Sequence, residues 1–318
     1  MSRRSRRVLN WSWRAWSLAG PSWDLIPLLA VVVVLGSGSA CRSPAIGERN
    51  TDPFPGMSAS DEIVSSLDGL SGLATDADGR LWVVSELGLL GLIKSEGMIE
   101  STIQIHGLEP LLEVEALAVL PNGDFVLGTE VDRARYSDKI LLVRQAEPDG
   151  RVSVYRSIEF DYREWSIEPP PDHGVEGVCA TDSEILAVGE PIVAKNGRRL
   201  APLGRWDMET EVWQRYYVEL TSERGKLSGL SCRIQGDRVE FVAIERDFGI
   251  THILRGALPS SDGGVIQPKI ARNWSGIETN LEGVSWQTDG TLLMIDDNFY
   301  RARRSGSSRL YHCILPVD

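Results

Sequence analysis

Hydrophobic residues along most of the chain come in short runs that are separated by polar turns, a pattern typical of β-hairpins. One unit recurs: a short apolar strand, a tight turn that carries Asn-Gly, Asp-Gly or a similar polar pair, and a second apolar strand. In the first copy, Leu70–Ala74 leads through Asp78-Gly79 to Leu81–Glu86. Helical periodicity is nearly absent. The pattern therefore predicts an all-β protein.

The polar residue that opens each copy gives the spacing of the repeat. These residues are Ser71, Glu115, Glu176, Ser228 and Glu282, at steps of 44, 61, 52 and 54 residues. Steps of this size match the four-stranded blades of a β-propeller. We therefore expect a five-bladed β-propeller. A six-bladed ring is the alternative, if the long second step contains a degenerate copy.

The two ends of the repeat region predict how the ring closes. Only 36 residues follow Glu282, too few for a complete blade, but a short stretch before the first copy could supply the missing strand. We expect a strand near Glu62–Leu67 to complete the blade that Glu282 begins and Arg309–Leu315 closes. Such pairing would remove the open sheet edge between the first and last blades.

The N-terminus has the three-part order of a bacterial export signal. A basic region with five arginines is followed by the apolar run Leu25–Leu35 and then by small residues before Cys41. The apolar run is shorter than the roughly 20 residues that span a bilayer. Gly38-Ser39-Ala40-Cys41 resembles a lipobox, whose cysteine becomes lipidated, although Gly38 replaces the usual leucine.

These features predict three segments: a lipoprotein-type signal peptide over residues 1–41, a linker over 42–60 and the propeller domain over 61–318. We expect the protein to be exported to the bacterial cell envelope and anchored to the membrane through Cys41, facing the periplasm or the exterior. A simply cleaved or uncleaved signal is the alternative. Either the general or the twin-arginine export route fits the basic region.

Composition and charge narrow the partners. Hydrophobic residues make up 42% of the chain and charged residues 25%, which excludes a disordered protein. The net charge is −12, and the chain after residue 41 has 28 basic against 44 acidic residues, so a nucleic-acid partner is not expected. Cys179 and Cys232 stand at near-equivalent positions of consecutive inner strands. The sequence allows a disulfide between these two cysteines, but buried free thiols are the favoured interpretation.

The residues that open the copies would form a ring beside the central channel, because the first strand of each propeller blade lies there. Three carboxylates and two hydroxyls in one narrow place would repel one another unless a cation lay among them. Oxygen ligands without Cys or His favour Ca²⁺. We therefore expect a calcium site formed by Ser71, Glu115, Glu176, Ser228 and Glu282. The alternative is a structural role, in which these residues hydrogen-bond water or the neighbouring blade.

A second set of acids is predicted at the same mouth of the channel, because the second strand of each copy runs back antiparallel to the first. An acid stands at every such strand end: Glu86, Glu130, Glu190, Glu245 and Asp297. These rim acids are candidates for the catalytic base, or else solvated surface charges. Loop arginines follow them, and Arg133, Arg135, Arg246 and Arg301 are candidates for binding an anionic substrate, or else ordinary surface charges.

The order Ser-Glu-Glu-Ser-Glu around the ring resembles that of the calcium-activated nucleotidases (apyrases), five-bladed propellers with one Ca²⁺ in the channel. The surrounding sequence is more similar to the bacterial esterase-like phytase family, above all in Asn280–Trp286 with Asp289-Gly290 and Asp296–Phe299, and in Val114–Ala118 with Pro121–Gly123. The similarity covers residues 61–315.

This resemblance implies a calcium-bound propeller that hydrolyses phosphate esters or anhydrides, with the metal role on the five ring residues. Ala116 stands where the phytase-like sequences usually have glycine, and nucleotidase motifs outside the ring are absent, so nucleotide specificity is not implied. We therefore expect a monomeric, calcium-dependent phosphoesterase that acts on a small phosphorylated or anionic substrate. The alternative is a non-catalytic, lipid-anchored binding module of the envelope whose calcium is structural.

Overall fold

The computed structural model describes residues 57–63, 67, 69–94, 97–131, 136–145, 151–168, 174–247, 249–259, 263–274, 280–297 and 308–315. For residues 57–63 it describes the backbone alone. The predicted signal peptide with Cys41, and most of the predicted linker, lie outside this part of the chain. No helix among the described residues is long and apolar enough to cross a membrane.

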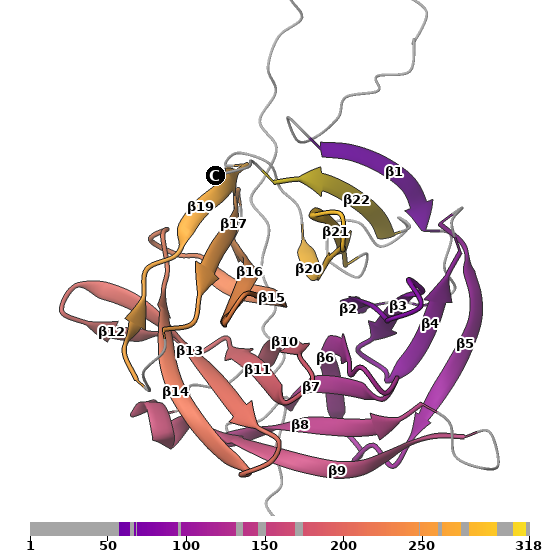
Figure 1. Ribbon diagram of the computed structural model, residues 1–318, viewed down its shortest axis with the longest axis horizontal. Coiled ribbons are helices and arrows are strands. Elements are labelled where there is room, and N and C mark those ends of the chain that lie inside the picture. The colour runs from indigo at the N-terminus through magenta and orange to yellow at the C-terminus, as the bar shows by residue number, and fades with distance from the viewer. Residues whose placement is uncertain are drawn as a thin grey trace, which may run out of the picture. The chain divides into compact units, whose positions relative to one another are not determined.

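Five four-stranded antiparallel blades make up the described part of the chain, and each begins with the strand that carries a ring residue (Figure 1). Blade 1 consists of β2 (Leu70–Thr75), β3 (Leu81–Ser85), β4 (Leu89–Ile93) and β5 (Ile99–His106), and blade 2 of β6 (Leu112–Val119), β7 (Phe125–Val131), β8 (Ser137–Arg144) and β9 (Val152–Asp161). Blade 3 consists of β10 (Val175–Ala180), β11 (Glu184–Gly189), β13 (Arg198–Asp207) and β14 (Val212–Glu219), with the short β12 (Val193–Lys195) beside β13.

Blade 4 consists of β15 (Lys226–Gln235), β16 (Arg238–Asp247), β17 (Ile250–Ala257) and β19 (Lys269–Asn273). Blade 5 consists of β20 (Leu281–Trp286), β21 (Thr291–Asp296), β22 (Ser308–Ile314) and β1 (Met57–Ile63). The innermost strands β2, β6, β10, β15 and β20 contact one another in that order, and β20 contacts β2. The predicted five-bladed β-propeller is therefore confirmed.

The six-bladed alternative is wrong for the described chain. The long step between Glu115 and Glu176 contains the remaining strands of blade 2 and one 3₁₀ helix, Tyr162–Trp165, rather than another sheet. Much of the extra length lies between β9 and β10, over residues 162–174, which include this 3₁₀ helix, whereas only residues 107–111 separate β5 from β6. β8 and β9 are also longer than β4 and β5. A long repeat step thus reflects a long connection between blades together with longer outer strands.

The ring closes through a strand from the N-terminal side, as predicted. β1 pairs antiparallel with β22, from Met57 opposite Cys313 to Ile63 opposite Ser308. The strand ends at Ile63, so the predicted location near Glu62–Leu67 is too late in the sequence. The first and last blades are thereby joined by backbone pairing between the two ends of the described chain.

Neighbouring blades are also linked along their outer edges. β5 of blade 1 pairs in parallel with β9 of blade 2. A short strand, β18 (Val265–Ile266), lies in the chain between β17 and β19 of blade 4 but pairs in parallel with β14 of blade 3. These additions cover edges that would otherwise present unpaired backbone groups.

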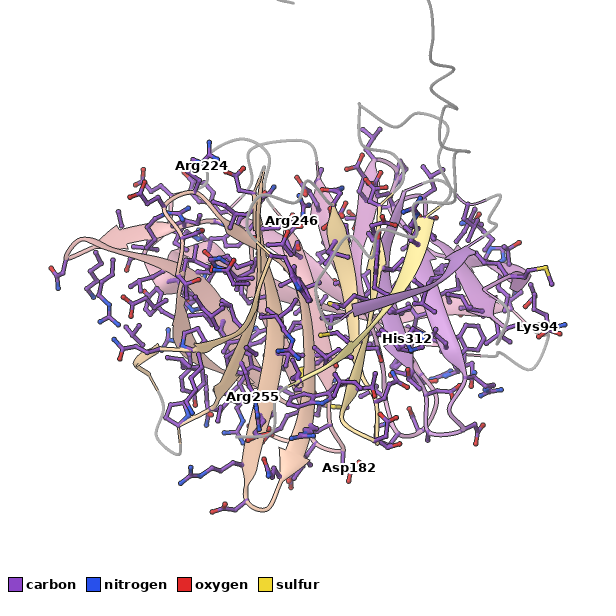
Figure 2. The ribbon with its side chains drawn as sticks, turned by 90° about the horizontal axis from the view of Figure 1, so that it is seen from above. Lys94, Asp182, Arg224, Arg246, Arg255 and His312 are labelled. Atoms are coloured by element: carbon purple, nitrogen blue, oxygen red, sulfur yellow. A yellow bond between two sulfur atoms is a disulfide. The ribbon has the colours of Figure 1, made fainter. Side chains whose placement is uncertain are left out.

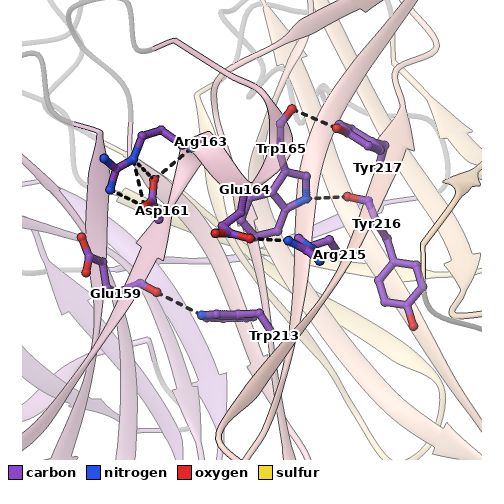
Figure 3. Close-up of polar contacts among 9 residues, drawn as sticks. All are labelled: Glu159, Asp161, Arg163, Glu164, Trp165, Trp213, Arg215, Tyr216 and Tyr217. Atoms are coloured by element: carbon purple, nitrogen blue, oxygen red, sulfur yellow. Dashed lines mark hydrogen bonds and ion pairs between the residues drawn. The ribbon is translucent and has the colours of Figure 1, made fainter.

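The 3₁₀ helix that follows blade 2 is held against β14 of blade 3 (Figure 3). The Trp165 indole nitrogen donates to the Tyr216 carbonyl at 2.9 Å, and the Tyr217 hydroxyl donates to the Trp165 carbonyl at 2.9 Å. An ion pair between Arg215 and Glu164 lies beside them. Trp165 is almost fully buried, so this helix contributes a large apolar side chain to the packing between blades 2 and 3.

The inner strands approach one another so closely that glycine is required beside the ring. A Cβ atom added at Gly229 would lie 2.3 Å from the backbone oxygen of Glu282, and one added at Gly72 would lie 2.6 Å from the backbone nitrogen of Leu117. Backbone atoms cannot move aside as a side-chain end can. Each of these glycines therefore allows the inner strand of one blade to contact the next.

Cys179 and Cys232 form a disulfide, with 5.7 Å between their Cα atoms, so the preference for free thiols is wrong. The near-equivalent positions in β10 and β15 bring the two residues together because those inner strands are adjacent around the channel. The disulfide therefore joins blades 3 and 4 covalently. Cys313 is a buried free thiol.

Removing this disulfide is expected to lower the free energy of unfolding by about 4 kcal/mol, because it closes a long loop in the unfolded chain. The double variant Cys179→Ala, Cys232→Ala would be compared with the wild type by urea unfolding, with and without reductant. Reductant should bring the wild type to the level of the variant and leave the variant unchanged. Equal stability of both proteins under oxidising conditions would contradict the prediction.

Candidate functional site

Each ring residue lies on a β-bulge at the start of an inner strand. The pairing register between the first two strands of the blade shifts at this point in all five blades, between Leu70 and Gly72 in blade 1 and at the matching place in the others. A bulge leaves one residue out of the ladder and redirects its side chain. The five ring residues, Ser71, Glu115, Glu176, Ser228 and Glu282, thus share one structural position.

The two serines of the ring connect blades. Ser71 Oγ donates to the Val114 carbonyl at 2.5 Å, and Ser228 Oγ donates to the Leu281 carbonyl at 2.8 Å. In both cases the acceptor precedes the ring residue of the following blade. The hydroxyls therefore hold adjacent inner strands together, while their oxygen lone pairs remain capable of metal binding.

Glu282 forms an ion pair with Arg246 of the neighbouring blade. Both of its carboxylate oxygens accept from Arg246, at 3.2 Å from Nε in one of the two contacts. The pKa of Glu282 is raised to about 8, mainly by burial and also by repulsion from Glu176. The attraction of Arg246 lowers this pKa but does not offset the effect of burial. Arg246 was expected in a substrate-binding loop, but it lies within β16 and holds this carboxylate.

Glu176 is a buried carboxylate that forms no ion pair within the described part of the chain. Its side chain is buried, with 6% of the residue exposed, and it has no hydrogen-bond or ion-pair partner within the described chain. Carboxylate oxygens of Glu130, Glu176 and Glu190 lie within 4.8 Å of one another. An unpaired buried charge of this kind is costly unless a proton or a cation neutralises it.

The surrounding acids respond to Glu176. Burial, followed by repulsion from Glu176, raises the pKa of Glu130 to about 8 and holds the pKa of Glu115 well above its usual value. Burial also raises the pKa of Glu86 to about 7, with repulsion from Asp297, Glu113 and Glu176 adding to it. These raised pKa values indicate that negative charge is crowded at the mouth, and a bound cation would favour the ionised state of these groups.

Four of the five predicted rim acids occupy equivalent places. Glu86, Glu190 and Asp297 each donate their backbone N–H to the carbonyl of the residue two positions before the ring residue of their own blade. Glu130 lies opposite Glu113, which is also two positions before the ring residue. The end of the second strand thus returns to the ring, as expected.

Glu245 is the exception, and its assignment to the rim needs correction. In blade 4, Lys226 stands two positions before the ring residue Ser228. Its cross-strand partner is Arg246 and not Glu245. Glu245 lies one residue earlier and is fully buried. Because side chains alternate between the two faces of a strand, a shift of one residue turns the carboxylate away from the mouth.

Glu245 instead holds the loop that leads into β15. It accepts hydrogen bonds from the backbone N–H groups of Thr221 at 3.0 Å and Ser222 at 2.9 Å, and from the hydroxyls of both residues. Burial would raise the pKa of Glu245, but these hydrogen bonds outweigh it and lower the pKa below its usual value. This carboxylate is a structural anion: the loop supplies its hydrogen bonds, and His252 Nδ1 of β17 lies 3.5 Å from its Oε2.

Sequence reasoning overlooked a lysine at the mouth. Lys226 begins β15, two residues before Ser228, and its ammonium forms an ion pair with Glu190 of blade 3. The sequence contained a signal for this lysine, because the residue two positions before each ring residue lies opposite the rim position of the same blade. Arg133, Arg135 and Arg301 lie outside the described residues, so their predicted role in substrate binding stays a prediction.

The mouth lies on one face of the propeller. Arg246 and Arg224 are on this side, whereas Asp182, in the turn between β10 and β11, lies at the opposite face (Figure 2). Blades 1, 2, 3 and 5 present acids there, and blade 4 presents basic residues. The mouth is therefore acidic on four of its five blades and basic on the fifth.

The donors at the mouth fit a hard divalent cation. They are carboxylate and hydroxyl oxygens, with no thiolate or imidazole in the ring, and the central carboxylate, Glu176, has no partner within the described residues. Such a set matches the preference of Ca²⁺ for oxygen ligands. The geometry can thus hold a cation and place a polar ligand next to it.

The chain belongs to the phytase-like family, described as having the esterase-like activity of phytase, because the family model matches residues 65–299. Among curated proteins no relative matches. The match covers the ring, the rim acids and most of the five blades. The fold and family expected from the sequence are therefore both confirmed.

Several solved structures are similar at low sequence identity. The PQQ-bound aldose sugar dehydrogenase of Streptomyces coelicolor is 10% identical, with a TM-score of 0.46 over 83% of this chain and 100% of its own. The gluconolactonase XC5397 of Xanthomonas campestris is 11% identical, with a TM-score of 0.41 over 78% and 72%. The calcium structure of a Trichoderma reesei carbohydrate-active enzyme of family AA12 is 10% identical, with a TM-score of 0.40 over 81% and 97%. These likenesses are too distant to transfer any residue role or activity.

Proposed function

We propose that the protein is a calcium-dependent hydrolase of phosphate esters or anhydrides that acts on a small phosphorylated substrate. The observation that carries this proposal is the buried, unpaired Glu176 at the centre of a group of carboxylates with raised pKa values. Membership of the phytase-like family supports the class of reaction. The acidic mouth would repel a phosphate group unless a cation were bound, so cation binding and substrate binding belong together.

Glu115 and Glu176 would hold the cation, with oxygens of Ser71, Ser228 and Glu282 completing the ring and Glu130 and Glu190 beside them. When bound, calcium would polarise a phosphoryl oxygen and position a water molecule. The glycines beside the ring keep the inner strands close enough for these side chains to converge. Arg246 binds both carboxylate oxygens of Glu282 and fixes their orientation, so it is a positioning residue rather than a substrate ligand.

A rim acid would accept the proton of the attacking water. Glu86 is the strongest candidate, because it is only partly buried, has no ion-pair partner within the described chain, and has a pKa of about 7. A base whose pKa lies close to the working pH is both available and effective. Glu130 and Asp297 are the further candidates, whereas Glu190 is paired with Lys226.

We further propose that the protein works outside the cytoplasm. The export-type residues 1–41 and the lipobox-like cysteine at position 41 support a lipid-anchored envelope protein. The disulfide between Cys179 and Cys232 is consistent with an oxidising compartment. In this arrangement the propeller would act as a monomer on a substrate that reaches the cell surface or periplasm.

A non-catalytic binding module with structural calcium is the second candidate. It is favoured by the contacts of the ring with neighbouring blades, in which Ser71 and Ser228 donate to backbone carbonyls and Arg246 of blade 4 pairs with Glu282 of blade 5. A cation at this place would tie the inner strands together whether or not chemistry occurs there. The two candidates differ in turnover alone.

The decisive experiment is an activity screen of the mature protein against phosphate esters, nucleotides and inositol phosphates. Each substrate would be tested with calcium and with a chelator. Phosphate release that requires calcium would support the hydrolase. Calcium binding, measured by calorimetry, without turnover of any substrate would favour the binding module, and no calcium binding at all would contradict both.

Calcium affinity is expected to rise about tenfold or more between pH 6 and pH 8.5. The pKa values of Glu86, at about 7, and of Glu130 and Glu282, at about 8, mean that protons occupy these carboxylates at the lower pH and must leave when the cation enters. Calorimetry in buffers of different ionisation enthalpy would measure both affinity and proton release. The same affinity at both pH values, without proton release, would contradict this prediction.

A further inference from the structure

Blade 4 presents two basic residues at the mouth where the other blades present acids. Lys226 and Arg246 face each other across β15 and β16, and each pairs with a carboxylate of a different neighbouring blade. Lys226 pairs with Glu190 of blade 3, and Arg246 pairs with Glu282 of blade 5. The same cross-strand position in blade 2 holds two acids, Glu113 and Glu130. The basic pair therefore interrupts an otherwise acidic mouth.

The two ion pairs differ in how easily they can open. The Arg246 side chain is 16% exposed and holds Glu282 through two nitrogen atoms. The Lys226 side chain is 39% exposed and reaches Glu190 with its single ammonium group at the end of a flexible stem. A strongly hydrated point charge on such a stem can move into solvent, whereas a buried, two-point guanidinium contact cannot. Arg246 is a fixed counter-ion, and Lys226 is a movable one.

Glu190 is also part of the carboxylate group that a cation would use. Its oxygens lie within 4.8 Å of those of Glu130 and Glu176, so the ammonium of Lys226 stands at the edge of that group. A divalent cation among these oxygens would repel the ammonium and compete with it for Glu190. The Lys226 ammonium and a bound cation would therefore occupy overlapping positions beside Glu190.

We propose that Lys226 is a displaceable internal counter-ion: it neutralises Glu190 until a divalent cation enters the group of Glu130, Glu176 and Glu190, and the released ammonium then binds the phosphate group of the substrate. This inference rests on the proposed function, because it presupposes a cation at the mouth. Lys226 sets the cation concentration at which the site fills. It also makes the cation and an anionic ligand assist each other, since the cation frees the group that the anion needs.

Chemical labelling of the native protein tests the release directly. Reductive methylation of lysines, followed by mass spectrometry, would be carried out without ligand, with calcium, and with calcium plus phenylphosphonate, a phosphate-ester analogue that cannot be hydrolysed as an ester. Calcium should accelerate labelling of Lys226 about fivefold or more, and added phenylphosphonate should slow it again. Lys94, which pairs with Glu100 away from the mouth, is the internal control (Figure 2). Unchanged labelling of Lys226 on addition of calcium would overturn the proposal.

Calorimetry with calcium alone tests the competition. Lys226→Gln should bind calcium about tenfold more tightly than the wild type, because the competing charge is gone. Lys94→Gln, which makes the same change of net charge elsewhere, should bind calcium as the wild type does. Equal or weaker binding by Lys226→Gln overturns this inference and leaves the proposed function standing. Absence of calcium binding in the wild type overturns both.

Discussion

Replacing Glu176 with glutamine is expected to weaken calcium binding at the channel mouth by about 100-fold or more, which corresponds to roughly 3 kcal/mol. Glutamine keeps the shape of the side chain but removes the charge that faces Glu115, Glu130 and Glu282. In the absence of calcium the same change should raise the melting temperature, because it removes repulsion from a crowded group of buried carboxylates. Any calcium-dependent phosphate release should be lost with the binding.

The measurements are calcium calorimetry and thermal unfolding with and without calcium. Glu164→Gln is the matched control, since Glu164 is an exposed acid that pairs with Arg215 between blades 2 and 3, away from the channel (Figure 3). It should leave calcium affinity unchanged. A Glu176→Gln protein that keeps the calcium affinity of the wild type would show that the cation, if any, binds elsewhere. A lower melting temperature without calcium would show that the carboxylates are not in conflict in the metal-free protein.

Proline at two successive positions of β1, Ser58→Pro together with Ala59→Pro, is expected to open the ring. Both residues lie opposite β22, at His312 and Tyr311. In an antiparallel pair, alternate N–H groups point toward the neighbouring strand, so two successive prolines must remove at least one of the ladder hydrogen bonds. The melting temperature should fall by about 10 °C or more, because the first and last blades lose their shared strand.

Exposure of β22 gives this variant a second readout. An uncovered strand edge pairs readily with another chain, so the variant should form dimers or larger species that the wild type does not form. Sedimentation velocity would detect them. Ser58→Ala keeps the backbone N–H and should behave as the wild type. A monomeric double-proline variant with an unchanged melting temperature would mean that β1 contributes little to closure.

The number of blades and their closure could be predicted because they depend on local patterns that repeat. Short apolar strands and glycine-containing turns mark each hairpin, and the spacing of the hairpins counts the blades. The position of β1 was predicted too late by several residues, because an outer strand is fixed by its pairing with β22 rather than by a pattern of its own. The sixth-blade alternative arose because repeat spacing does not reveal how the residues of a long step divide between the outer strands and the connection to the next blade.

The site was predicted less completely, because its details depend on register and on contacts between blades. The ring residues share one structural position, since a bulge recurs at the same place in every copy. The assignment of Glu245 to the rim was wrong, because the hairpin of β15 and β16 places Arg246 opposite Lys226 and turns its neighbour inward. The counter-ions of Glu190 and Glu282 come from the adjacent blade, and no pattern within a single repeat contains that information.

The strand that closes the ring also imposes an order of events on folding. β1 is the first described strand to be made and β22 the last, yet the two are partners in one sheet. Contacts between such distant parts of a chain form slowly, because the intervening loop must close first. A partly synthesised or partly translocated chain therefore cannot reach the closed state. Closure of the ring therefore waits until β22, the last described strand, has been made and can pair with β1.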